Sequence, residues 1–163
     1  SFYRFMAISI SQIEDLINEG LKEHQHLYVV DLDISLQNHI KLVIDGDQDV
    51  SIQDCIALSR AVEHNLDREI EDFSLDVSSF GATSPLKLER QYAKNVNRKL
   101  EVKLEDETIK ADLVDVNNDQ ITLHWKAREP KPIGKGKHTV EKTKTIPINT
   151  IIEAKVMINF NKK

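Results

Sequence analysis

Residues 72–86 read DFSLDVSSFGATSPL, and this stretch marks the change from one part of the chain to the next. Phe73, Leu75 and Val77 alternate with polar residues, which predicts a strand with one buried face. Residues 78–85 are small or turn-forming, with one glycine and one proline among them, and predict a compact loop. We therefore expect one structural unit to end here and a second to follow.

The charge of the chain changes sign close to this stretch. Residues 1–93 hold 7 Lys+Arg and 17 Asp+Glu, whereas residues 94–163 hold 15 and 10. The two parts carry net charges of −10 and +5, which together give the −5 of the whole chain. Such asymmetry favours two parts with different binding partners. We predict an N-terminal domain at residues 1–92 and a C-terminal domain at residues 93–163.

The composition is that of a globular protein, with 40% hydrophobic and 30% charged residues in a chain of 163. No apolar run approaches the ~20 residues of a membrane-spanning helix, and no signal peptide is apparent. We expect a cytoplasmic protein without a membrane partner. The single cysteine, Cys55, agrees with a reducing compartment. Residues 1–5 precede Met6 and fit no later pattern, so we interpret them as left over from expression.

The first part of the chain predicts an α+β domain with the order helix, strand, strand, helix, strand. A capping box at Ser11 predicts the first helix, and Ser51 with Asp54 predicts the second. Alternating residues predict a hairpin from strands 28–34 and 40–44. We expect a three-stranded sheet with both helices on one face and the 28–34 strand in the centre. The expected apolar stripe of the second helix is Ile52, Cys55, Ile56, Ser59, Val62 and Leu66.

The second part predicts a small antiparallel β-barrel of the SH3-like or Sm-like kind. A short helix is expected within residues 86–98, and a tight helical turn at Asn149 and Thr150. Five short strands separated mainly by turns are typical of such a barrel. The expected strands lie at residues 100–104, 109–114, 121–125, 146–148 and 154–160.

The candidate metal and catalytic residues do not form a complete site. Asp45, Asp47 and Asp49 resemble the start of a calcium loop, but Val50 and Ile56 occupy the positions that require glycine and glutamate. We interpret the three aspartates as solvated turn residues. The six histidines are scattered, so no metal site is expected.

No enzyme motif is present either. The sequence has no nucleophile elbow and no glycine-rich phosphate loop, and Ser79 has no base near it in sequence. Cys55 lies on an expected apolar stripe, where a thiol behaves as a small hydrophobic group. We therefore predict no catalytic residue and no cofactor.

Three stretches resemble the RimP family of ribosome maturation factors. They are VVDLDI at residues 29–34, IKLVIDGDQDVSIQDCIALSRAVEHNLD at residues 40–67 and FSLDVSSFGATSPL at residues 73–86. The resemblance implies a cytoplasmic bacterial factor that helps the small ribosomal subunit to mature without catalysing a reaction. It also implies an N-terminal α/β domain joined to a C-terminal SH3-like barrel. The positions that match the family pattern are Asp45, Gly46, Asp54, Cys55, Ser59, Arg60, Val77, Ser78, Ser79, Gly81, Pro85 and Leu86.

The loop departs from the family pattern at two positions. Phe80 replaces a proline and Ser84 replaces an arginine. Without that arginine the loop cannot bind a phosphate or carboxylate bidentately through it. The loop can therefore be read either as a partner site or as a tight joint of small residues.

Residues 126–144, KAREPKPIGKGKHTVEKTK, predict a long mobile loop because prolines and glycines interrupt a polar stretch. The stretch holds 7 Lys+Arg and 2 Glu, a net charge of +5. Clustered cations favour phosphate binding, and a solvated connection is the alternative. The candidate RNA-binding residues are Lys126, Arg128, Lys131, Lys135, Lys137, Lys142 and Lys144.

The resemblance favours a non-enzymatic ribosome assembly factor, which we expect to be monomeric. The acidic first domain is expected to bind a basic ribosomal protein, which the resemblance implies is protein S-twelve, while the basic loop binds rRNA of a small-subunit precursor. The candidate protein-binding residues are Asp45, Gly46, Asp47, Asp49, Asp54, Ser78, Ser79, Gly81 and Pro85. The alternative is an Sm-like RNA-binding regulator, against which stands the shortage of exposed aromatic residues for base stacking.

Overall fold

The computed structural model describes residues 8–158, so residues 1–5, interpreted above as left over from expression, lie outside the described part. The chain divides into two compact units, Ser1–Phe80 and Gly81–Lys163, called unit 1 and unit 2 below. A compact unit is not by itself a domain that folds alone. The domain boundary after residue 92 therefore stays a prediction.

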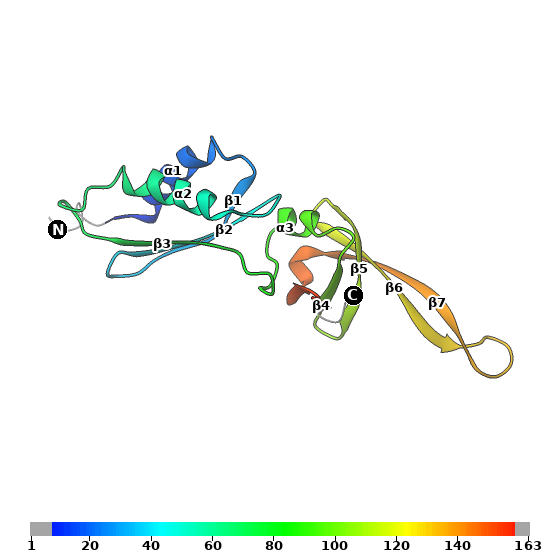
Figure 1. The fold of residues 1–163 in the computed structure, drawn as a ribbon. Helices are drawn as coiled ribbons and strands as arrows, with labels where there is room; N and C mark the ends of the chain where they lie inside the picture. Colours follow the sequence, from blue (N-terminus) through cyan, green and yellow to red (C-terminus); the bar gives the residue numbers. More distant parts are fainter. Residues whose placement is uncertain (1–7, 159–163) are drawn as a thin grey trace. The chain divides into compact units, whose positions relative to one another are not determined.

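The described residues of unit 1, 8–80, form two helices on one face of a three-stranded sheet (Figure 1). Its elements are α1 (Ile10–Leu21), β1 (Leu27–Ile34), β2 (His39–Gly46), α2 (Ile52–Glu63) and β3 (Ser74–Ser79). β1 pairs with β2 antiparallel, and β2 pairs with β3 parallel. The predicted mixture of helices and strands and their order are confirmed.

The central strand is β2, so the prediction that the 28–34 strand lies in the centre is wrong. The helix α2 carries the chain from β2 to the adjacent parallel strand β3, which leaves β1 on the outer side of the hairpin. Ile40, Leu42 and Ile44 of β2 are at most 1% exposed, as expected for a strand paired on both sides. They pack with Ile13 and Ile17 of α1 in one apolar core.

The two helices begin at capping serines, one of which was predicted. Ser51 Oγ accepts a hydrogen bond from Asp54 N (3.1 Å), and Asp54 Oδ2 accepts one from Ser51 N (2.9 Å). This confirms the second predicted capping box. The first cap is Ser9, whose Oγ accepts from Gln12 N (3.1 Å), so the prediction of Ser11 is wrong.

The apolar face of α2 also differs from its predicted stripe. Leu58 and Val62 are fully buried, and Cys55 packs partly against the core. Ile52 and Ile56, in contrast, are 75% and 40% exposed. Positions 55, 58 and 62 share one side of a helix, whereas 52 and 56 lie on a neighbouring side, which turns these two isoleucines outward.

In unit 2, residues 81–158 form one short α-helix and a five-stranded antiparallel sheet in the order β7-β6-β5-β4-β8. Its elements are α3 (Glu89–Lys94), β4 (Lys99–Lys103), β5 (Thr108–Asn117), β6 (Gln120–Pro130), β7 (Lys137–Pro147), the 3-10 turn η2 (Ile148–Thr150) and β8 (Glu153–Val156). η2 confirms the predicted helical turn. Within residues 8–158 no pairing joins β7 to β8, so the closed SH3-like barrel stays a prediction.

The expected mobile loop at residues 126–144 is a regular β-hairpin, so that prediction is wrong. β6 and β7 pair without a break from Gln120 opposite Pro147 to Pro130 opposite Lys137. Near the sheet one face of the hairpin is apolar, with Ile121, Leu123 and Ile146 buried, whereas the other face carries polar pairs: Thr122 Oγ1 lies 3.1 Å from Thr145 Oγ1. Cross-strand pairs of this kind stabilise a two-stranded ribbon. Gly134 and Gly136, with φ of 85° and 92°, allow the chain to reverse at the end.

Gly20 permits α1 and α2 to approach closely. A Cβ atom at Gly20 would lie 2.8 Å from Ala61 Cβ and 3.1 Å from Leu58 Cδ2. Gly20→Ala raises helix propensity by about 1 kcal/mol, but crowding of a packed interface costs about 1–3 kcal/mol. We expect Gly20→Ala to lower the free energy of unfolding by about 1 kcal/mol, measured by urea denaturation.

The double variant with Ala61→Gly provides the control. When Ala61 Cβ is absent, its contact with the new methyl group disappears, and the same Gly20→Ala change should become neutral or stabilising. An equal loss of stability in both backgrounds would show that the α1–α2 contact is not what selects glycine.

Candidate functional site

The carboxyl ends of β2 and β3 lie side by side because the two strands are parallel. Ile44 is opposite Ser79, and Phe80 N donates a hydrogen bond to Ile44 O (2.8 Å). The β2 end with Asp45 is therefore next to Ser78 and Ser79, as the predicted protein-binding site requires. Both serines belong to β3 and are exposed, whereas the sequence placed them in the loop.

The turn after β2 has a fixed backbone and two outward acids. Asp47 N donates to His26 O (2.9 Å), and a Cβ atom at Gly46 would lie 2.9 Å from Gln48 O, so glycine is needed there. Asp47 and Asp49 are exposed. Asp45 is 5% exposed and its Oδ1 accepts from Gly46 N (2.9 Å), so its description as a solvated residue is wrong.

Asp54 and the exposed isoleucines of α2 continue this surface along the chain. The Asp54 side chain is 16% exposed, and its Oδ1 lies 3.5 Å from His26 Nε2. The hydrogen bond from Ser51 N is the main cause that lowers the pKa of the Asp54 carboxyl, so this group is ionised at neutral pH. The sequence pattern placed Ile52 and Ile56 on the buried stripe of the helix, and that prediction is wrong. Their mismatch with the spacing of Cys55, Leu58 and Val62 was a signal of their exposure.

We call Asp47, Asp49, Ile52, Asp54, Ser78 and Ser79 the acidic edge. Gly81 and Pro85, the other two predicted protein-binding residues, are exposed and belong to unit 2. Ser84 N donates to Gly81 O (3.1 Å), which forms a turn in the stretch that follows β3.

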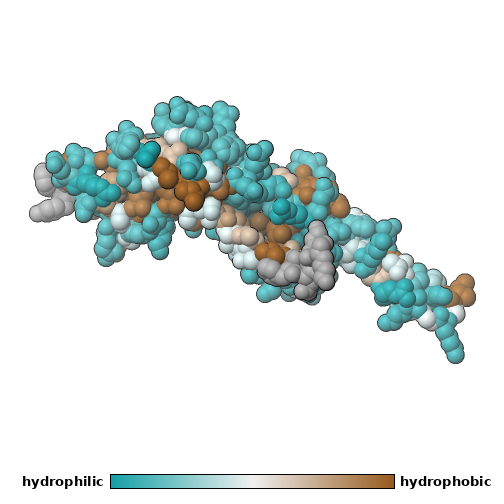
Figure 2. Space-filling view, viewed as in Figure 1, coloured by the Kyte–Doolittle hydropathy of each residue, from teal (hydrophilic) through white to brown (hydrophobic). Residues whose placement is uncertain are grey.

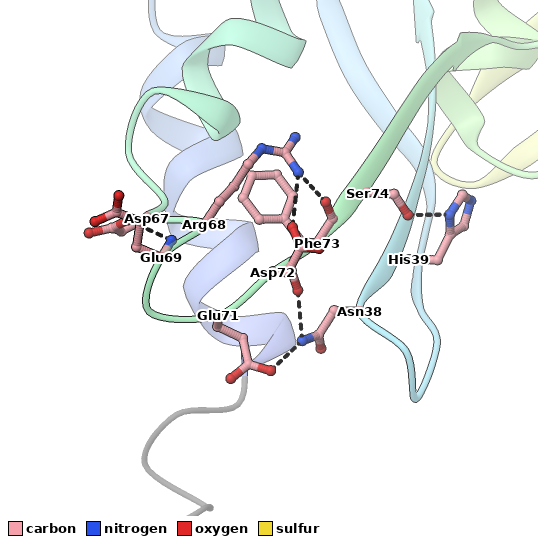
Figure 3. Close-up of polar contacts among 9 residues, drawn as sticks. All are labelled: Asn38, His39, Asp67, Arg68, Glu69, Glu71, Asp72, Phe73 and Ser74. Carbon is pink, nitrogen blue, oxygen red and sulfur yellow. Dashed lines mark hydrogen bonds and ion pairs between the residues drawn. The ribbon is translucent and has the colours of Figure 1, made fainter.

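The connection from α2 to β3 is held by a separate group of polar contacts (Figure 3). Asn38 Nδ2 donates to Glu71 Oε1 (2.7 Å) and to Asp72 O (3.2 Å). The Arg68 guanidinium donates to Phe73 O, and its central carbon lies 4.0 Å from the centroid of the Phe73 ring. These contacts attach the connection to the β1–β2 turn, so they have a structural role.

A serine, a histidine and an acid meet at the start of β3. His39 Nδ1 lies 2.6 Å from Ser74 Oγ, and His39 Nε2 lies 3.0 Å from Asp76 Oδ2 (the Ser74 contact is drawn in Figure 3). Hydrolases use these three residue types with a buried acid that orients the imidazole. Here the Asp76 side chain is 71% exposed, so water competes for its carboxylate. The group is a cross-strand polar contact of the sheet surface.

The seven predicted RNA-binding cations all lie on the β6–β7 hairpin. Lys126 and Arg128 are on β6, Lys131 and Lys135 are in the turn, and the other three are on β7. Lys142 Nζ lies 2.6 Å from Glu129 Oε2. Lys144 Nζ lies 2.8 Å from Glu107 Oε2, and this hydrogen bond raises the pKa of the Lys144 ammonium. The hairpin is therefore not uniformly cationic.

Two kinds of feature are absent from the described residues. Within residues 8–158 no group of three His, Cys, Asp or Glu side chains could hold a metal ion. No helix in the same part of the chain is long and apolar enough to cross a membrane.

Comparison with known proteins identifies one protein family. The residues that its family model matches include most of unit 1. The family model "RimP N-terminal domain" matches residues 16–83. A ribosome maturation factor RimP of Christiangramia forsetii is 52% identical over 149 residues, which cover 91% of this chain and 97% of the relative. Its counterpart in Flavobacterium psychrophilum is 46% identical over the same shares. The chain therefore belongs to the RimP family of ribosome maturation factors.

The Asp54 cap gives a pH-dependent prediction. The folded-state pKa lies below the ordinary value of 3.8, so the folded state binds fewer protons and the charged cap stabilises it above that pH. We expect Asp54→Ala to lower the free energy of unfolding by about 1 kcal/mol at neutral pH. The loss should shrink as the pH falls through and below 3.8.

Asp49→Ala is the matched control, since Asp49 is an exposed acid in the turn before the helix. Urea denaturation of both variants across the acid range makes the comparison. A loss of stability in Asp54→Ala that is the same at acid and neutral pH would contradict the role of the charge.

Proposed function

We propose that this chain is a non-enzymatic factor for maturation of the small ribosomal subunit. Family membership, through a relative 52% identical over 91% of the chain, is the observation that carries this proposal. Relatives along nearly the full length bear the name ribosome maturation factor. We place its action in the cytoplasm, as a monomer, on a small-subunit precursor.

The proposal assigns the two binding tasks to two domains, residues 1–92 and 93–163. The acidic edge of the first is the site for a basic ribosomal protein, for which we propose protein S-twelve of the small subunit. The second, which we propose closes into an SH3-like barrel, carries the basic hairpin for rRNA. The opposite charges of the two parts, −10 for residues 1–93 and +5 for residues 94–163, support this division.

The acidic edge has the composition of a protein interface. Ile52 is a large apolar side chain, 75% exposed, that lies in the chain between the acids Asp49 and Asp54. An apolar anchor with charged residues around it combines affinity from burial with selection of a partner by charge. Gly46 and Asp45 then act indirectly, because both are buried and shape the turn that presents Asp47 and Asp49.

Capture of ribosomal particles tests the function as a whole. The tagged chain, used as bait in cells that lack their own copy of this factor, should enrich free small-subunit precursors over mature subunits. Enrichment of bulk small RNAs without precursors would instead favour the Sm-like RNA-binding regulator.

Charge at the acidic edge should govern the rate of association. We expect Asp47→Asn together with Asp49→Asn to slow binding to purified protein S-twelve at low salt, with an effect that shrinks as salt rises. Asp31→Asn with Asp33→Asn changes the net charge equally on exposed residues of β1 and is the control. If stopped-flow measurements show that the two double variants slow association equally, the turn with Asp47 and Asp49 is not part of the interface.

The apolar anchor should govern dissociation instead. Burial of an isoleucine contributes about 1.5 kcal/mol or more, so Ile52→Ser should raise the dissociation rate about tenfold with little dependence on salt. Leu36→Ser, at a side chain that is 99% exposed in the β1–β2 turn, should leave the rate unchanged. If Ile52→Ser dissociates like the unaltered chain, the anchor lies outside the interface.

A further inference from the structure

The outer part of the β6–β7 hairpin projects from the sheet as a two-stranded arm (Figure 1). β5 pairs with β6 only as far as Asp112 opposite His124, so residues 125–130 of β6 pair with β7 alone. We call residues 125–142 the hairpin arm. Because no third strand among residues 8–158 pairs with the arm, both of its faces and its tip are available to a partner.

The register of the arm sorts its cations onto opposite faces. In an antiparallel pair, opposed residues share a face and successive residues alternate between faces. Lys126 opposite Glu141, Arg128 opposite Thr139 and Lys137 opposite Pro130 therefore lie on one face. We call Lys126, Arg128 and Lys137 the cationic face. Lys142 lies opposite Trp125 and Lys144 opposite Leu123, which puts them on the other face.

The two faces differ in how their charges are compensated. On the second face, Lys142 is paired with Glu129 and Lys144 with Glu107, at 2.6 and 2.8 Å. On the cationic face the only carboxylate among residues 125–142 is that of Glu141, which lies opposite Lys126 and 3.2 Å from His124 Nε2. The ammonium groups of Lys126 and Lys137 have no carboxylate within ion-pair distance among residues 8–158 and are exposed. Uncompensated positive charge is thus confined to one face and the tip.

Arg128 is held in place on this face. Its guanidinium donates to Thr139 Oγ1 (3.0 Å) and to Lys137 O (3.2 Å). A guanidinium carries five N–H donors, so three remain for an anion. Because the side chain is already ordered, binding costs less conformational entropy, and a fork of N–H groups suits a phosphate.

The arm lacks the groups that bind single strands. Single-stranded nucleic acid is held by base stacking on aromatic side chains. Residues 126–144 contain no Phe, Trp or Tyr, and Trp125 at the base of the arm is half-buried. Figure 2 shows the arm covered mainly by hydrophilic residues, with a hydrophobic spot at its outer end, where Ile133 is 87% exposed. A surface of cations without stacking groups recognises backbone charge.

We propose that Lys126, Arg128 and Lys137 form a one-sided site for the backbone phosphates of double-stranded RNA. The choice of RNA rests on the proposed function; the cationic face and the preference for a duplex rest on the arm itself. Side chains two residues apart on a strand are spaced by about 7 Å, comparable to the spacing of phosphates along a nucleic-acid strand. The arm lies with this face on the duplex while the ion-paired face stays in solvent.

Two charge-matched double variants of the full chain test the site. Lys126→Gln with Lys137→Gln alters the cationic face, and Lys142→Gln with Lys144→Gln removes the same charge from the other face. Affinity for a short RNA duplex and for one of its single strands is measured across a salt series, with melting curves to verify folding. The first variant should flatten the slope of log affinity against log salt by about two units, from the duplex-DNA coefficient. The second should leave that slope nearly unchanged.

Three results would overturn the site: equal flattening by both variants, single-strand binding as tight as duplex binding, or no duplex binding by the unaltered chain. Each of these leaves the proposed function standing if the chain still enriches small-subunit precursors. If the unaltered chain binds duplex RNA but does not enrich small-subunit precursors, the proposed function is wrong and the proposed RNA site still stands.

Discussion

The parallel pairing of β2 with β3 is the constraint on which the arrangement of unit 1 depends. It places β2 in the centre of the sheet, so that Ile40, Leu42 and Ile44 are covered by both helices. It also brings two carboxyl strand ends to one edge, where α2 begins. The acidic turn leads directly into the capped start of α2, and the β2–β3 pairing brings the exposed serines of β3 beside the end of β2. The proposed protein-binding surface of unit 1 is thus a consequence of its topology.

The hairpin arm of unit 2 shows how polar contacts across two strands can support regular structure. The Lys142–Glu129 ion pair and the hydrogen bond from Arg128 to Thr139 join β6 to β7, and two glycines with positive φ close the turn. The ion pair with Glu129 neutralises the positive charge of Lys142, whereas Lys126 has no ion-pair partner among the described residues. The contacts that stabilise the arm therefore also determine which of its faces keeps cations without an ion-pair partner.

Local sequence patterns correctly predicted those structural features that depend on residues close together in the chain. The order of elements in unit 1, the Ser51–Asp54 capping box and the η2 turn follow from periodicity and short-range hydrogen bonds. The central position of β2 and the exposure of Ile52 depend on tertiary packing, which a single sequence does not display. The arm was missed because its cross-strand partners are far apart in sequence and its prolines and glycines resemble a loop. Sequence patterns identified the acidic residues of the candidate site. They did not predict how the cations are distributed between the two faces of the hairpin.

The central claim of this account is that unit 1 meets protein and the hairpin arm meets RNA in the same precursor particle. Photo-cross-linking from position 52 and, separately, from position 126 inside captured small-subunit precursors tests it most directly. The account predicts that position 52 cross-links to a basic ribosomal protein and that position 126 cross-links to rRNA. Cross-links from position 52 to RNA alone, or from position 126 to protein alone, would contradict it.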